Sequence, residues 1–196
     1  MSIRTKGNRG PSAAAENRAA LLEAARAVFE ERGPDAPLSL VAKRAGVGQG
    51  SLYRHFPDRI AIAVAVMDAN MADIEAAAAD PGATMREVMD LITHQSEGAA
   101  ALIEISTRAR DDRRLEPLNA RLRTALETVL ARAQASGEVG HHVGVDELLL
   151  SVTLIAGAML LTPTAQRSDV AHKAWELITP ALDPQPTSPP QTPPQR

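Results

Sequence analysis

The sequence contains no cysteine and only four aromatic residues. Without cysteine, the chain has no disulfide framework, no thiolate metal ligand and no cysteine nucleophile. Three of the four aromatic residues lie within the first 60 positions, so the core of the remaining chain must be built from aliphatic side chains. Stacking against a flat cationic ligand is therefore poorly supported.

Long hydrophobic runs and enzyme motifs are also missing. No run of 18 uncharged apolar residues occurs, which excludes a hydrophobic spanning helix. The basic residues near Met1 are not followed by an apolar run, so we expect no secretory signal and a cytoplasmic protein. No nucleophile motif, glycine-rich phosphate loop or HExxH zinc motif is present. These absences predict a protein that is not an enzyme.

Metal and cofactor sites are not expected either. His141 and His142 are adjacent, but no carboxylate or third histidine recurs at the spacing of metal ligands. We therefore predict no metal site and no cofactor.

The charge is distributed unevenly along the chain. Although the whole sequence carries a net charge of −3, residues 1–59 hold ten Lys or Arg and six Asp or Glu, a balance of +4. Residues 60–196 hold the remaining 11 basic and 18 acidic residues, a balance of −7. A basic segment joined to an acidic body is typical of a DNA-binding domain attached to a second domain.

Apolar spacing predicts an all-α protein, because alanine is abundant and strand-like Val and Ile runs are absent. Helices are expected over residues 16–32, 38–45, 48–56, 58–79, 84–97, 98–110, 115–136, 145–162 and 168–182. We expect four regions: a flexible basic arm over residues 1–14, a DNA-binding domain over 15–59, a helical regulatory and dimerisation domain over 60–182, and a disordered Pro-rich tail over 183–196. The arm either adds phosphate or minor-groove contacts or is a solvated tail.

Residues 38–56 have the pattern of a helix-turn-helix. Leu38, Val41, Ala42 and Ala45 share one helical face, and Gly46 can make the following turn because glycine adopts positive φ freely. The second helix enters the major groove in such motifs. Its outward residues suit that task, because Gln can bond adenine and hydroxyl or basic groups can bond phosphate.

The segment AGVGQGSLYRHFPDR closely resembles the DNA-binding signature of the TetR (tetracycline-repressor-like) family of bacterial transcription regulators. This resemblance covers roughly residues 16–62, and it implies a three-helix head on a helical body. Gly48 departs from the serine common in the family, and Arg59 replaces the commoner lysine. By resemblance and helix position together, the predicted DNA contacts are Ser39, Gln49, Gly50, Ser51, Tyr53, Arg54, His55 and Arg59.

The helix over residues 145–162 is apolar on nearly every side, which favours burial against a second subunit. With the last helix it can form a four-helix interface between two copies, as the resemblance also implies. The alternative is that it forms the core of a monomer. Candidate interface residues are Leu150, Leu154, Gly157, Leu161, Trp175 and Ile178.

A small-molecule effector is implied by the resemblance alone. Its pocket would lie between the long helix after the head and the body helices, and each candidate residue can equally be ordinary core. The candidates are Met67, Met71, Met89, Ile92, Leu102, Ile103, Leu126 and Met159.

These observations predict a dimeric transcription regulator that binds double-stranded DNA. We expect a repressor released from a pseudo-palindromic operator by a small molecule. The alternative is a ligand-independent or architectural DNA-binding protein, which a dry, fully packed body would favour.

Overall fold

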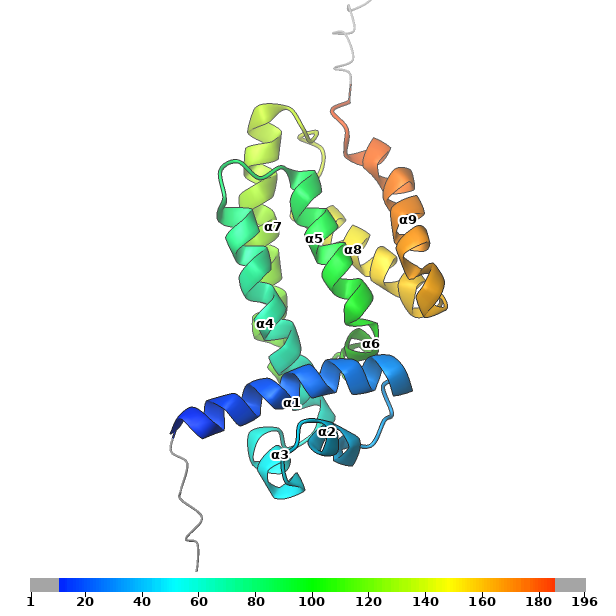
Figure 1. Cartoon of the computed structure of the whole chain (residues 1–196). Helices are drawn as coiled ribbons and strands as arrows, with labels where there is room; N and C mark the ends of the chain where they lie inside the picture. Colours follow the sequence, from blue (N-terminus) through cyan, green and yellow to red (C-terminus); the bar gives the residue numbers. More distant parts are fainter. Residues whose placement is uncertain (1–10, 186–196) are drawn as a thin grey trace, which may run out of the picture.

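The computed structural model describes residues 11–185, and within them the chain forms helices joined by turns, with no strand (Figure 1). This confirms the predicted all-α class. Three helices at the N-terminal end form a head, and the helices that follow form an elongated body above it. The first ten residues of the predicted arm and the tail beyond residue 185 lie outside the described residues.

The head consists of α1 (Pro11–Arg32), α2 (Leu38–Arg44) and α3 (Gln49–His55). The first helix begins at Pro11 and not at residue 16, so residues 11–14 are helical and not part of an arm. Proline suits the first helical turn, where a missing N–H costs no hydrogen bond. The alanines that follow favour helix and allow it to start early.

The turn between α2 and α3 depends on Gly46, whose φ of 69° lies in the left-handed region. The N–H of Val47 then donates to the carbonyl of Ala42 at 3.1 Å, which closes the end of α2. This turn fixes how α3 leaves the head.

One hydrophobic cluster holds the head together and continues into the body. Its fully buried members include Phe29 from α1, Val41 from α2 and Leu52 from α3. Leu102 and Ile105 of the body belong to the same cluster. The head therefore shares its core with the first part of the body.

The body begins with a long helix that leaves the head and continues through five more helices. Their bounds are α4 Arg59–Ala79, α5 Met85–Gly98, α6 Ala100–Arg108, α7 Glu116–Ser136, α8 Val145–Leu160 and α9 Arg167–Leu182, with short 3-10 turns η1 Arg113–Leu115 and η2 Thr164–Gln166. In Figure 1, α4 and α7 run side by side, and α8 and α9 lie to the right of α5.

Local residues fix three helix ends close to the predicted bounds at residues 58, 84 and 136. The carboxylate of Asp58 accepts from the N–H of Ala61 at 2.7 Å and caps α4. Thr84 and Glu87 form a capping box at α5. Gly137, with φ 78°, ends α7. Local residue choice determined these boundaries, so they were visible in the sequence.

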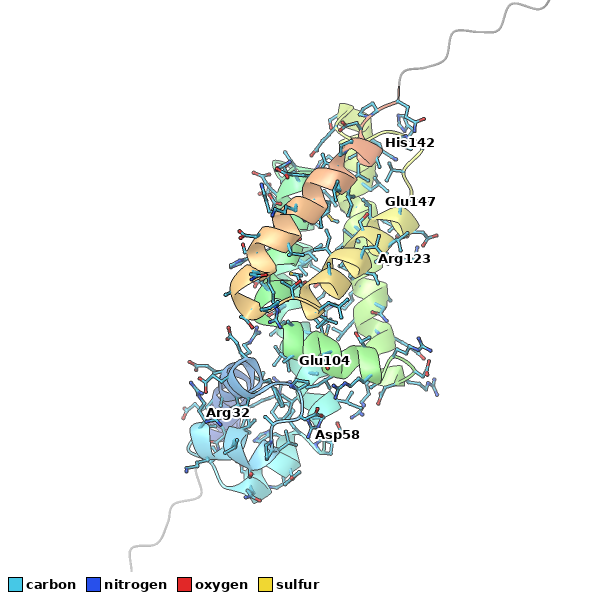
Figure 2. The ribbon with its side chains drawn as sticks, turned by 90° about the vertical axis from the view of Figure 1, so that its right-hand side faces the viewer. Arg32, Asp58, Glu104, Arg123, His142 and Glu147 are labelled. Atoms are coloured by element: carbon cyan, nitrogen blue, oxygen red, sulfur yellow. The ribbon has the colours of Figure 1, made fainter. Side chains whose placement is uncertain are left out.

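Two arginines, Arg108 at the end of α6 and Arg114 in η1, tie the body to the head. Arg108 contacts both carboxylate oxygens of Asp35 at 3.1 Å, in the loop between α1 and α2. Arg114 contacts both oxygens of Asp58 at 3.1 Å, at the start of α4. Figure 2 shows Asp58 where the head meets the body. The head and the body are thus joined by ion pairs as well as by a shared hydrophobic core.

No helix within residues 11–185 is long and apolar enough to cross a bilayer.

Candidate DNA interface and internal cavity

The outer face of α3 carries exposed polar side chains. Gln49 and Gly50 are exposed at its N-terminal end, and Tyr53 is 51% exposed one turn further on. Leu52 and the following Phe56 point inward and are 1% and 2% exposed. The buried residues hold the helix on the head, so its opposite face is free to meet a partner.

The other predicted DNA contacts near this face differ in solvent exposure. Ser39 is exposed near the start of α2, while Ser51 and His55 are half-buried on α3. The rings of His55 and Phe56 are 6.2 Å apart, which places the imidazole against the head. Gly48 caps α3 without a side-chain hydrogen bond, because it has no side chain to supply one.

Two arginines predicted to contact DNA instead form hydrogen bonds within the chain. The Nε of Arg54 donates to the carbonyl of Gly50 at 3.2 Å, so the side chain lies back along α3. Arg59 donates to the carbonyl of Pro34 and lies 3.8 Å from Asp35. The sequence could not reveal the partners of Arg59, because the loop between α1 and α2 is brought to it only by the fold.

Lys43 was missed as a candidate contact. It is exposed on α2, four residues after Ser39 and so on the same helical face, and takes part in no ion pair within residues 11–185. The sequence feature that could have identified Lys43 is its position in the last turn of α2, directly before α3.

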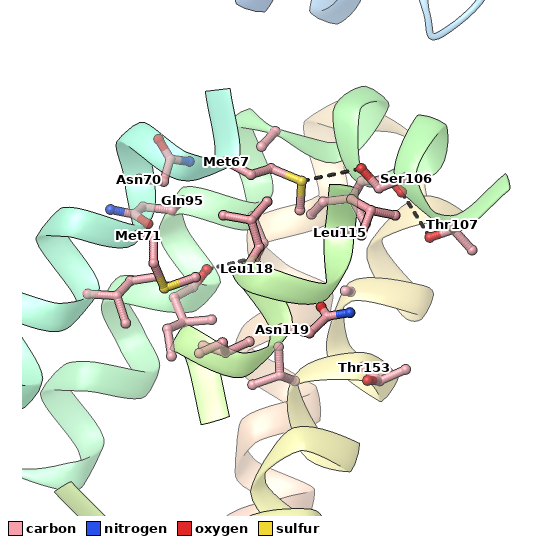
Figure 3. Close-up of a pocket in the computed structure, with 18 of the residues that line it drawn as sticks. Met67, Asn70, Met71, Gln95, Ser106, Thr107, Leu115, Leu118, Asn119 and Thr153 are labelled. Atoms are coloured by element: carbon pink, nitrogen blue, oxygen red, sulfur yellow. Dashed lines mark hydrogen bonds between the residues drawn. The ribbon is translucent and has the colours of Figure 1, made fainter. Parts of the chain in front are cut away.

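A cavity of about 480 Å³ lies between α4, α5, α6, α7 and α8. Its volume falls in the range of small-molecule sites. Figure 3 shows Met67 and Met71 of α4 and Leu118 of α7 converging on it. Exposed lining residues, among them Arg110, Asn119 and Thr153, mark the side where it meets solvent.

The eight predicted pocket residues divide evenly between cavity wall and core. Met67, Met71, Ile92 and Ile103 line the cavity. Met89, Leu102, Leu126 and Met159 do not, and all four are 2% exposed or less. Helical spacing identifies apolar residues that face inward, but it does not separate a cavity wall from a filled core.

Polar lining residues were missed altogether. Asn70 and Gln95 lie beside the two methionines in Figure 3, and Ser96 also lines the cavity. Asn70 also accepts a hydrogen bond at 2.7 Å from Arg26 of α1, so it connects the cavity to the head. Its position between Met67 and Met71 on one face of α4 was the available signal.

Some of the predicted dimer-interface residues are exposed, and the others face the interior of the body. Leu150 and Leu154 of α8 form a stripe with Leu161, which directly follows the helix, and these residues are 57%, 57% and 92% exposed. Gly157 instead lines the cavity. Trp175 is half-buried and donates from Nε1 to the Thr93 hydroxyl at 2.8 Å.

Ile178, the sixth candidate, is half-buried and packs against the hydrophobic clusters of the body. It and Trp175 face α5 and α8 because α9 turns its apolar side inward. On α9, the large apolar side chain left in solvent is Leu177, which is 81% exposed.

A strong electrostatic perturbation lies at the head–body junction. The Arg114 guanidinium hydrogen-bonds Asp112 and lowers the pKa of that carboxyl to about 2 from an ordinary 3.8. The same bonds, with those to Asp58, raise the pKa of Arg114. Arg114 is therefore held as a fixed cation between two carboxylates.

No group of three His, Asp or Glu residues suited to a metal occurs within residues 11–185. His142 instead lies 3.0 Å from the carbonyl of Ala181, where it joins the loop after α7 to the end of α9.

Comparison with known proteins agrees with this arrangement. Residues 21–66 match the family model described as bacterial regulatory proteins of the tetR family. No curated protein matches the sequence. A TetR transcriptional regulator from Streptomyces coelicolor is 26% identical, with a TM-score of 0.59 over 86% of this chain and 99% of that one.

Two further structures share the fold. A TetR regulatory protein from Mycobacterium vanbaalenii is 26% identical, with a TM-score of 0.58 over 88% of this chain and 98% of its own. A gamma-butyrolactone receptor described as ArpA-like is 20% identical, with a TM-score of 0.58 over 88% and 90% of the two chains. Residues 21–66 therefore match the DNA-binding domain of the tetR family of bacterial regulatory proteins, and the chain as a whole shares the fold of TetR transcriptional regulators.

Proposed function

We propose that this protein is a homodimeric, cytoplasmic repressor that leaves a pseudo-palindromic operator when a small molecule enters its body. The observation that carries the proposal is the connection between cavity and head. Asn70 lines the cavity and bonds Arg26 of α1, and the segment that holds Leu115 on the cavity wall also holds Arg114 on Asp58.

The DNA contacts are proposed for α2 and α3. Gln49 and Gly50 lie at the exposed N-terminal end of α3, where residues of a recognition helix meet base edges. Tyr53 and Ser39, with Lys43 added, are suited to phosphate oxygens. Ser51 and His55 contribute from their exposed edges, whereas Arg54 and Arg59 must exchange intramolecular bonds for phosphate.

The effector acts by differential binding to two arrangements of the head. A ligand that binds one arrangement more tightly shifts the population towards it. Because two heads must fit successive major grooves, a small change in their spacing weakens both half-site contacts at once. The cavity favours this gated mechanism over a ligand-independent DNA-binding protein, since a constitutive binder needs no hollow body.

The similar structures support the proposal only in outline. One of them is described as a receptor for gamma-butyrolactone, so this fold can hold a small-molecule site in a related protein. The ligand of this chain has to be identified from its own residues.

The test is selection of bound genomic fragments, including DNA upstream of the protein's own gene, followed by footprinting. We expect a protected pseudo-palindrome with one half-site per subunit. Gln49→Ala should relax the preference at one position in each half-site, at a cost of about 1–3 kcal/mol for the preferred base. The control is Gln166→Ala, which removes an exposed glutamine from η2 in the body.

An unaltered selected motif for Gln49→Ala would refute base reading by that residue. Binding to every fragment with equal affinity and no protected site would refute the operator-specific function itself.

A further inference from the structure

We infer that the cavity takes an uncharged, non-aromatic, mainly aliphatic molecule that carries a hydroxyl or another hydrogen-bond donor. The inference rests on the proposed function in that this molecule would be the effector. It follows from five properties of the cavity wall, which together exclude flat aromatic, cationic and anionic ligands and favour a hydrogen-bond donor.

The wall is mostly aliphatic. Its apolar residues come from five helices and include Ile74, Ile103, Leu118, Leu122 and Leu160. No aromatic side chain is among the described residues that line the cavity, so a flat ring system has nothing to stack on. Flexible Met67 and Met71 can adapt to an irregular aliphatic chain.

No carboxylate lines the cavity within the described residues. An ammonium group that entered would lose hydration without gaining a counter-charge, and that loss is costly in an apolar site. Cationic amphiphiles are therefore excluded.

The hydroxyl groups on the wall have their protons engaged. Each donates to the carbonyl four residues earlier in its own helix, at 2.7 to 3.0 Å. The residues are Ser96, Ser106, Thr107 and Thr153. A hydroxyl whose proton is committed presents only lone pairs to a ligand, so these groups call for donors.

Gln95 gives the most specific indication that the ligand carries a hydrogen-bond donor. Its Oε1 is buried and has no hydrogen-bond partner within residues 11–185, whereas its Nε2 lies 3.4 Å from a carboxylate oxygen of Asp73. The carboxylate identifies which end of the amide carries hydrogen, because the reverse assignment would bring two acceptors together.

A buried acceptor without a partner destabilises the empty state, so a donor that reaches it gains more than it would at a solvated group. The last torsion of a glutamine side chain is broad and costs little to rotate. Because Gln95 already lines the cavity, rotation of its amide brings Oε1 to a ligand there.

Among the described residues that line the cavity, Arg110 is the one charged side chain, and it is exposed. A carboxylate held by it would remain in solvent, where such pairs contribute little. The same carboxylate would face the acceptors of the interior. A neutral ligand is therefore favoured over a fatty-acid anion.

The test uses calorimetric titration of the full chain with 1-nonanol and methyl octyl ether. These isomers have the same atoms, but only the alcohol has a hydrogen-bond donor. We expect the alcohol to bind at least about tenfold more tightly than the ether. Nonanoate should bind more weakly than the alcohol, and nonylammonium should bind weakest.

Two variants localise the effect. Gln95→Leu removes the acceptor at similar volume, so the alcohol and the ether should bind within about twofold of each other. Ala156→Leu, on the face of α8 that lines the cavity, fills the space and should weaken both ligands. Circular dichroism and light scattering establish that each variant remains folded and in the wild-type assembly.

The inference is overturned if the ether binds as tightly as the alcohol, if Gln95→Leu keeps the preference, if either ion binds more tightly, or if none of the four probes binds. Operator binding is measured separately on the same samples. If the chain binds its operator but none of the probes, the proposed ligand class is refuted and the proposed DNA-binding function stands. If it binds the alcohol without any change in operator affinity, the ligand class stands and control of operator binding by the ligand is refuted.

Discussion

Gly46 holds the turn that aims α3, and its φ of 69° is one that residues with a side chain rarely adopt. Gly46→Ala should therefore lower the free energy of unfolding by about 1–2 kcal/mol, although open space surrounds the added methyl group. Urea unfolding followed by circular dichroism measures this change.

Gly98→Ala is the matched control. It adds the same methyl group at the end of α5, where nothing lies within 4 Å and no positive φ opposes it. Its free energy of unfolding should equal or slightly exceed that of the wild type. Equal effects at both positions would show that backbone conformation is not what makes Gly46 necessary.

At this scale, local features were predictable and side-chain partners were not. Gly46, Asp58 and Gly137 act on backbone groups within a few residues, so their roles follow from the sequence. Arg59 and Trp175 meet partners supplied by distant segments, the carbonyl of Pro34 and the hydroxyl of Thr93. Sequence pattern indicates what such side chains can bond, but the fold determines which group they reach.

At the scale of elements, η1 is held to the start of α4 by charged groups that acid can neutralise. Asp112 has a pKa lowered to about 2 by its hydrogen bonds with Arg114. In the unfolded chain its pKa returns to the ordinary value of 3.8. Because the folded pKa is the lower one, its stabilisation is complete above about pH 5 and is lost as the pH falls towards 2.

Asp112→Asn should therefore lower the free energy of unfolding at pH 7, and the difference from the wild type should shrink to about half at pH 3. Urea unfolding at pH 7, 5, 4 and 3 gives the comparison. Asp111→Asn removes the neighbouring carboxylate and none of these hydrogen bonds, so at pH 7 it should behave as the wild type. A difference for Asp112→Asn that is the same at every pH would contradict a role for its charge.

Element order and helix type were readable from apolar spacing, whereas the cavity was not. Its lining comes from five helices, and an inward-facing Met71 resembles an inward-facing Met89 in sequence. Only the relative placement of α4 to α8 leaves one beside a hollow and the other in filled core. The polar lining residues escaped notice for the same reason, since Asn70 and Gln95 resemble ordinary surface amides until the helices are assembled.

For the whole molecule, we expect the apolar stripe along α8 to form the interface between two copies of the chain. Leu150 and Leu154 are each 57% exposed and Leu161 is 92% exposed, with Leu177 of α9 also in solvent. Exposed apolar groups of this size on neighbouring helices mark an interaction surface. A second copy of the chain is the partner that also gives two recognition helices with two-fold symmetry.

Leu154→Glu should therefore convert the protein into a monomer. In a two-fold interface each substitution acts twice, and loss of two buried leucines costs about 3 kcal/mol or more, at least about a hundredfold in the dimer dissociation constant. Multi-angle light scattering across a dilution series measures the mass, and Ala131→Glu, on the exposed side of α7, should leave it unchanged. Because a monomer holds only one half-site, Leu154→Glu should also lose operator binding while its circular dichroism spectrum stays helical. A variant that stays dimeric would move the interface away from α8, and a monomer with full operator affinity would contradict reading of paired half-sites.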